Sequence, residues 1–176
     1  MERHRPFLDI SSSAICDIGH KAIQGNDLET YSFCIAELAG RRRQNAKVFL
    51  EQLRESTDMV PISWIEQVAY ITHSQQWPQS GDCSIYLVLL SQPRKELGTY
   101  GIYVGETIHT PEKRFQVHKD EDGKRGSRHV KIRGIMLLPQ LYSHWNCLDR
   151  EDAKKWESVI ADAIRASLLC EVKGGH

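Results

Sequence analysis

The hydrophobic and polar positions of the chain follow a helical period in its first half. Between residues 27 and 55, apolar side chains recur at the three- and four-residue spacing of amphipathic helices, namely Leu28, Tyr31, Ile35, Leu38, Ala46, Phe49, Leu50 and Leu53. Because Gly40 interrupts this pattern, it predicts either one long kinked helix or a helix pair. A capping-box pair, Ser63 and Glu66, predicts a further helix over about 64–75. Residues 1–26 show no strong period and predict at most one short helix.

Short apolar runs replace the helical period after residue 82. Strands are expected over 83–90, 99–104 and 132–141, because these runs are rich in β-branched and aromatic residues. Thr110 and Pro111 predict a helix over 111–119, and Asp149 predicts a last helix from 150 to about 168. The fold class is therefore α+β, with a small, mainly antiparallel three-stranded sheet flanked by helices. Residues 1–80 form a helical extension and residues 81–176 a second domain.

Charge and cysteine content narrow the possible partners. The 23 basic and 23 acidic residues leave a formal net charge of zero, so any polyanion must be bound by a local patch. The five cysteines are odd in number and form no Cys-x-x-Cys pair, which indicates reduced thiols. There is no apolar run of membrane-spanning length and no signal peptide. A cytoplasmic protein with no membrane partner is expected.

Residues 99–118 bring polar chemistry to the end of one strand. Tyr103 lies at the end of the predicted second strand, and Gly105 lets the backbone turn toward the next helix. On that helix Arg114 and His118 share a face, because they are separated by four positions. A phenol, a guanidinium and an imidazole can therefore converge on one phosphate diester.

The order of these motifs resembles the GIY-YIG nuclease domain. Residues 84–86 read Ser-Ile-Tyr, residues 103–105 read Tyr-Val-Gly, and Arg114 with His118 follows as Arg-x-x-x-His. In that family a first strand carries Gly-Ile-Tyr, a second carries Tyr-Ile-Gly, and a later helix supplies a glutamate. The literal Gly-Ile-Tyr at 101–103 overlaps the second motif by position, not the first. The resemblance covers roughly residue 83 to the C-terminus.

The family's glutamate has a counterpart in the last predicted helix. On a helical wheel centred on Trp156, the apolar residues form one arc and Glu157 lies inside the edge of that arc. A buried carboxylate is costly unless it is paired or binds a metal. Glu157 is therefore the expected metal ligand, with Glu151 on the solvated face as the fallback. The asparagine that usually follows the glutamate in the family has no counterpart here, which puts the fine positioning of the site in doubt.

The resemblance implies a role for each catalytic residue. Tyr86 is the expected general base, with Tyr103 beside it to shape the site of the attacking water. Arg114 stabilises the charge that develops on the phosphate. His118 forms a hydrogen bond or takes part in proton transfer, and Glu157 holds one divalent metal, expected to be Mg²⁺ with Mn²⁺ as a substitute.

The expected substrate is DNA, bound by a basic stretch that follows the site. Arg41 to Arg43 are interpreted as a solvated face rather than a DNA contact. Six Lys and Arg residues against three acids lie between 119 and 133, which suits contact with phosphates. The expected nucleic-acid contacts are Thr107, Lys119, Lys124, Arg125, Arg128 and Lys131.

The functional expectation is a metal-dependent DNA endonuclease that resembles the restriction-enzyme branch of the family. One such site cuts one strand, so a double-strand cut implies either a homodimer or sequential nicking. The extension would supply DNA contacts or dimerisation. Two alternatives stay open: a nucleic-acid-binding module without catalysis, and a nuclease that acts on RNA or branched DNA.

Overall fold

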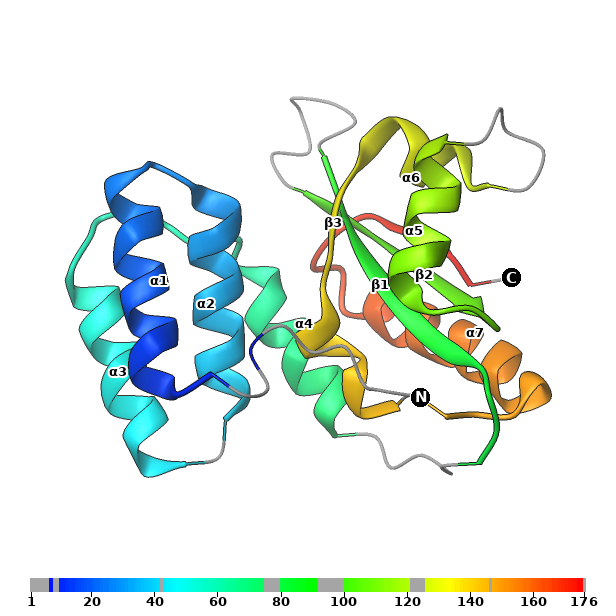
Figure 1. Ribbon diagram of the computed structural model, residues 1–176, viewed down its shortest axis with the longest axis horizontal. Coiled ribbons are helices and arrows are strands. Elements are labelled where there is room, and N and C mark those ends of the chain that lie inside the picture. The colour runs from blue at the N-terminus through cyan, green and yellow to red at the C-terminus, as the bar shows by residue number, and fades with distance from the viewer. Residues whose placement is uncertain are drawn as a thin grey trace. The chain divides into compact units, whose positions relative to one another are not determined.

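The chain forms two compact units (Figure 1). The computed structural model describes residues 7, 10–41, 43–74, 80–91, 100–120, 126–145 and 147–175. One unit spans residues 5–74, and the other contains residues 75–176. The division thus lies at residue 74, close to the boundary at residue 80 that the sequence predicts.

The first unit is helical. Its helices are α1 (Ser12–Gln24), α2 (Leu28–Gly40), α3 (Gln44–Glu55) and α4 (Trp64–His73). The region 27–55 is therefore a helix pair rather than one kinked helix. Helix α1 has 13 residues and is longer than the short helix expected. Ser11 is the N-cap of α1, and its hydroxyl accepts a hydrogen bond from the backbone amide of Ala14 at 3.2 Å.

The core of this unit lies between α1, α2 and α3. Gly19 leaves room for the side chain of Leu53, because a Cβ at position 19 would lie 2.5 Å from its Cδ2 and would force that side chain to move. This close approach lets α1 pack directly on α3. The main buried apolar side chains of the core are Ile15, Tyr31, Cys34, Ile35, Leu38 and Leu53.

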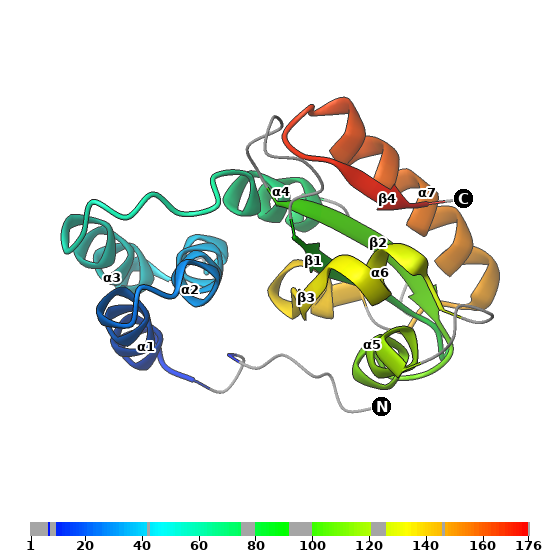
Figure 2. The ribbon, with the colours of Figure 1, turned by 90° about the horizontal axis from the view of Figure 1, so that it is seen from above.

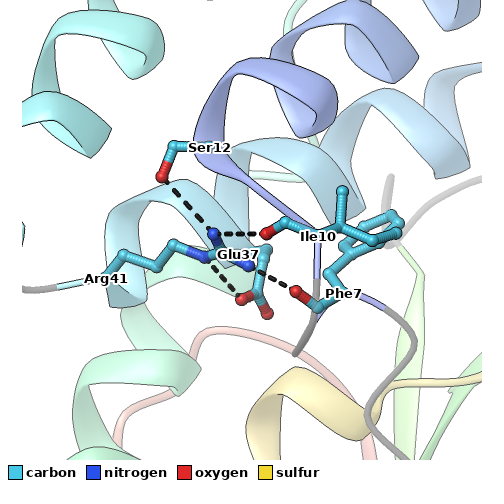
Figure 3. Close-up of polar contacts among 5 residues, drawn as sticks. All are labelled: Phe7, Ile10, Ser12, Glu37 and Arg41. Atoms are coloured by element: carbon cyan, nitrogen blue, oxygen red, sulfur yellow. Dashed lines mark hydrogen bonds and ion pairs between the residues drawn. The ribbon is translucent and has the colours of Figure 1, made fainter.

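Arg41 is a structural residue and not part of a solvated face (Figure 3). Its side chain is 13% exposed and its Nε donates to Oε1 of Glu37 at 3.0 Å. Nη1 donates to the carbonyl of Ile10 at 2.8 Å, and Nη2 donates to the carbonyl of Phe7. The guanidinium thus ties the segment before α1 to the end of α2. The interpretation of Arg41 as solvated is corrected; Arg43 is exposed, and Arg42 lies outside the described residues.

The predicted capping box at the start of α4 does not form. Ser63 has helical backbone angles and its side chain makes no capping hydrogen bond. Glu66 instead pairs with Arg54 of α3, with Oε2 and Nη2 separated by 2.5 Å. The helix lies close to its predicted position, but Glu66 forms an ion pair with another helix instead of the predicted capping box.

The second unit contains a mixed sheet of four strands within the described residues. The strands are β1 (Ser84–Leu90), β2 (Gly101–Thr107), β3 (Gly134–Leu137) and β4 (Val172–Gly174), in the order β3-β1-β2-β4. The pairs β1–β2 and β1–β3 are antiparallel, as predicted. Strand β4 is parallel to β2 and was not predicted. Its three residues are too few to show a period of two.

Helices cover both faces of this sheet. Helices α5 (Pro111–Asp120) and α6 (Arg128–Arg133) lie on one face, and α7 (Arg150–Ala166) lies on the other (Figure 2). This explains why all seven residues of β1 are buried. Among the described helices, none is both long and apolar enough to cross a membrane.

The predicted strand over 132–141 is mostly wrong. Its beginning belongs to α6, its middle is the short β3, and its end forms a 3₁₀ helix, Pro139–Leu141. A second 3₁₀ helix, Ser143–Trp145, follows it. Gly134 marks the transition, because a Cβ there would lie 2.5 Å from the carbonyl oxygen of Val130 in α6. The polar composition of 119–133 concealed α6, which has six residues and only one buried side chain.

Candidate active site

Tyr86 and Tyr103 lie side by side on neighbouring strands. In the β1–β2 register Tyr86 is opposite Gly105, and Tyr103 is two residues away on the same face of β2. The two ring centroids are 6.0 Å apart. A Cβ at position 105 would lie 2.7 Å from the Tyr86 hydroxyl and 2.7 Å from Cε1 of Tyr103. Gly105 therefore leaves space for the two tyrosine rings. The turn predicted at Gly105 is wrong, because β2 continues through this position to Thr107.

His118 of α5 completes this cluster. Its Nε2 lies 2.6 Å from the Tyr86 hydroxyl, and its ring forms an edge contact with Tyr103 at a centroid distance of 5.8 Å. The imidazole is 1% exposed. Burial, reinforced by the Arg114 guanidinium, lowers the pKa of His118 from 6.5 to about 4, so the ring is neutral at pH 7.

A backbone amide determines which nitrogen of His118 carries the proton. The N–H of Ser127 donates to Nδ1 across 2.6 Å, so Nδ1 is unprotonated. In the neutral ring the proton is therefore on Nε2, which donates to the oxygen of Tyr86. Ser127 comes just before α6. The sequence did not predict its role, because the contact is made by its backbone amide and does not depend on its side chain.

The hydroxyl of Tyr86 is fully buried and protonated in the free protein. Burial raises its pKa well above 10 and the Tyr103 hydroxyl raises it further, whereas the nearby Arg114 guanidinium lowers it. The pKa of Tyr103 is also raised, first by burial. Arg114 and the Nε2–H of His118 are thus the groups that favour ionisation of Tyr86.

Glu157 of α7 reaches the same site. It is only 7% exposed, and its negative charge raises the pKa of Tyr103, so the two side chains are electrostatic neighbours. The buried face of α7 consists of Ala153, Glu157, Ile160, Ala161 and Ile164.

The structure corrects the centre of the predicted apolar arc on α7. Val159 and Leu168 belong to the predicted apolar arc, but Val159 is 38% exposed, and Leu168 is 91% exposed and lies beyond the end of the helix. Trp156 is partly buried. Glu157 therefore lies within the buried face rather than at its edge, and Glu151 is exposed as expected.

The unexpected strand β4 brings a backbone amide to Glu157. The N–H of Gly175 donates to Oε1 of Glu157 at 3.1 Å. Gly174 has φ of +81°, and a Cβ there would lie 1.8 Å from the carbonyl oxygen of Val104. Gly175 has φ of +70°, and a Cβ there would meet Cβ of Ala161 at 2.3 Å. Both positions require glycine. The signal in the sequence was the Gly-Gly pair, in the region where the family's asparagine was expected.

The predicted nucleic-acid contacts have different surroundings. Thr107 is 4% exposed and lies at the end of β2, near Arg114. Lys119 of α5 donates to the carbonyl of Gly134 at 2.8 Å, so its ammonium group also holds β3 in place. Arg128 is exposed and Lys131 is partly buried on α6. Lys124 and Arg125 lie outside the described residues.

The surroundings of Glu157 fit a Mg²⁺ ligand. No group of three or more His, Cys, Asp or Glu side chains suited to a metal occurs in the described ranges. Mg²⁺ does not require one, because it is usually held by one or two carboxylates together with phosphate and water oxygens. A buried carboxylate oriented by the Gly175 amide meets that need.

Comparison of the chain with protein-family models, curated proteins and solved structures gives no match.

Proposed function

We propose that the chain is a metal-dependent endonuclease that hydrolyses phosphodiester bonds in DNA, with a site like that of the GIY-YIG nucleases. The observation that carries the proposal is the contact of Tyr86 with His118, with Arg114 and Glu157 beside the two tyrosines. These residues come from two strands and two helices, so only the fold brings them together.

The tyrosine pair supplies the group that accepts a proton from the attacking water. Ionised Tyr86 is the general base, because its oxygen receives the Nε2–H of His118 and lies near the Arg114 guanidinium. His118 acts as a hydrogen-bond donor in this arrangement. It does not remove the proton of Tyr86, since its only unprotonated nitrogen is held by Ser127.

Arg114 and Glu157 supply charge. The guanidinium of Arg114 is planar and always charged, and it stabilises negative charge on the phosphate in the transition state. Glu157 holds a divalent cation, Mg²⁺ or Mn²⁺, which when bound would polarise the phosphate and stabilise the leaving oxygen. The helical unit is assigned to DNA contact or dimerisation, and a homodimer would allow both strands to be cut.

A plasmid digest tests the proposal. The purified protein is incubated with supercoiled plasmid and Mg²⁺ or Mn²⁺. We expect cleavage by the wild type and a loss of roughly 10²- to 10³-fold in Arg114→Ala, which is the typical cost of removing one charge-stabilising group. Lys113→Ala is the matched control, because Lys113 is an exposed cation at the neighbouring position of α5. DNA binding without cleavage would instead favour a binding module, and cleavage of RNA alone would change the substrate class.

A further inference from the structure

A polar cleft next to the proposed active site has the composition of a phosphate-binding site. Its volume is about 150 Å³. Its lining residues come from the end of β2 and the turn after it, from α5, and from the first residue of α7. The residues that line it are Glu106, Thr107, Ile108, His109, Arg114 and Arg150.

We propose that this cleft binds a second phosphate of the nucleic-acid strand, next to the scissile one, and that Arg150 is its principal ligand. The inference rests on the proposed nuclease function. Arg114 connects the two sites, because it lines the cleft and also lies near the hydroxyl of Tyr86. A phosphate in the cleft is therefore close to a phosphate at Tyr86, and both belong to one strand.

The charges of the cleft favour an anion. Arg114 and Arg150 form no ion pair with any residue in the part of the chain that the structure describes. Arg133 and Arg165, in contrast, are paired with carboxylates at 2.6 and 2.7 Å. Glu106 is the one carboxylate among the lining residues, so two guanidinium groups face one negative charge. A guanidinium that is not paired with a carboxylate is suited to bidentate binding of phosphate.

Thr107 adds a directed hydroxyl donor. Its Oγ1 accepts the backbone N–H of His109 at 3.0 Å, which leaves the hydroxyl hydrogen to donate. The amides at the start of α7 do not take part, because the side chain of Asp149 already accepts from Glu151 and Asp152 at 2.9 and 2.8 Å. The anion must therefore be held by side chains, and Arg150 is the cation that α7 contributes.

DNA binding without cleavage tests this inference. The affinity for a fluorescent duplex of mixed sequence is measured by anisotropy in EDTA over a range of NaCl concentrations. Arg150→Ala is expected to bind roughly tenfold more weakly, with a salt slope reduced by about 0.9, the value for one phosphate contact. Arg150→Lys keeps the positive charge but loses the planar guanidinium that can bind phosphate through two hydrogen bonds. It should therefore keep the wild-type salt slope and lose less affinity than Arg150→Ala.

Lys154→Ala is the matched control, because Lys154 is exposed one turn further along α7 and does not line the cleft. It should change the affinity by less than about twofold. Equal affinity and equal salt slope for the Arg150→Ala and Lys154→Ala variants would overturn the second phosphate site, provided that their melting curves match that of the wild type. If Arg150→Ala weakens DNA binding as expected but the wild type does not cleave plasmid, the second phosphate site is supported and the proposed nuclease function is refuted.

Discussion

The backbone amide of Ser127 lies 2.6 Å from Nδ1 of His118 and donates a hydrogen bond to it. This contact leaves the ring proton on Nε2, where it points at the Tyr86 oxygen. The sequence-based expectation allowed His118 either a hydrogen bond or a share in proton transfer. The geometry favours the hydrogen bond, because the proton is already on the nitrogen that faces Tyr86.

Replacement of His118 by glutamine separates these two roles. The glutamine amide nitrogen can donate to Tyr86 while its carbonyl oxygen accepts from Ser127. If His118 acts only as a donor, His118→Gln should keep cleavage within about tenfold of the wild type, whereas His118→Ala should lose more. A loss of 10²- to 10⁴-fold in the glutamine variant would show that the imidazole transfers protons. Single-turnover cleavage rates make the comparison.

The buried neutral imidazole should make stability depend on pH. The pKa of His118 is lowered from 6.5 to about 4, so between these values the unfolded chain binds a proton that the folded chain does not. The stability is fully present above about pH 6.5 and falls by up to roughly 3 kcal/mol as the pH drops to about 4.

Urea unfolding near pH 7 and near pH 4.5 measures this dependence. His118→Gln has no titrating ring, so it should lose less stability on acidification than the wild type, while all carboxylates stay the same. An identical acid destabilisation of the two proteins would contradict a buried neutral histidine at this position.

The two tyrosines should differ in their effect on catalysis. Tyr86 receives the hydrogen bond from His118, so Tyr86→Phe should bind DNA normally and lose roughly 10²- to 10⁴-fold in rate. Because its pKa is raised well above 10, the wild-type rate should rise with pH through the neutral and mildly alkaline range as the ionised fraction increases. A larger loss in Tyr103→Phe would assign the base to Tyr103 instead.

The sequence predicted the parts of the fold that have strong local signals. Strands β1 and β2 and helices α5 and α7 lie close to their predicted positions, because apolar runs and caps such as Asp149 mark them. Strand β4 and helix α6 were missed, since their three and six residues carry no readable period.

The side chains of the candidate site were predictable, but the groups that position them were not. Tyr86, Arg114 and His118 were identified by their motif order. The amides of Ser127 and Gly175 are backbone groups, and any residue type except proline carries such a donor. Their importance therefore depends on tertiary structure alone.

Glu157 is the proposed metal ligand, and its replacement should separate metal-dependent cleavage from DNA binding. Glu157→Gln keeps the shape and the hydrogen bond from Gly175 but removes the charge that attracts Mg²⁺. Cleavage should be lost, while DNA binding should persist or tighten because a negative charge near the phosphate is gone. Stability should not fall, because burying an ionised carboxylate is itself costly.

Glu151→Gln is the control on the same helix, since Glu151 is exposed. It should be nearly silent in cleavage assays, gel shifts and melting curves. Cleavage by Glu157→Gln, or loss of cleavage in Glu151→Gln, would overturn the assignment of the metal ligand.

The amide of Gly175 should tune the metal site through Glu157, with which it forms a 3.1 Å hydrogen bond. An ester in place of the peptide bond before residue 175 removes this N–H without adding atoms that the site has no space for. Cys170 makes the experiment practical, because a synthetic peptide of residues 170–176 can be ligated to a thioester of residues 1–169. A lost hydrogen bond to a charged group costs about 1.5–3 kcal/mol. The ester protein should therefore need at least roughly tenfold more Mg²⁺ for half-maximal cleavage, with a smaller change in the maximal rate.

The ester also weakens the carbonyl of Gly174, which accepts a hydrogen bond from Nη2 of Arg165. Arg165→Ala removes that second bond while leaving the Gly175 amide in place, so it is the matched control alongside a ligated chain with the normal amide. If Gly175 positions the carboxylate, the Mg²⁺ requirement should rise in the ester protein and stay near that of the amide chain in Arg165→Ala. An equal rise in both would assign the effect to the packing of β4, and no rise in the ester protein would remove Gly175 from the site.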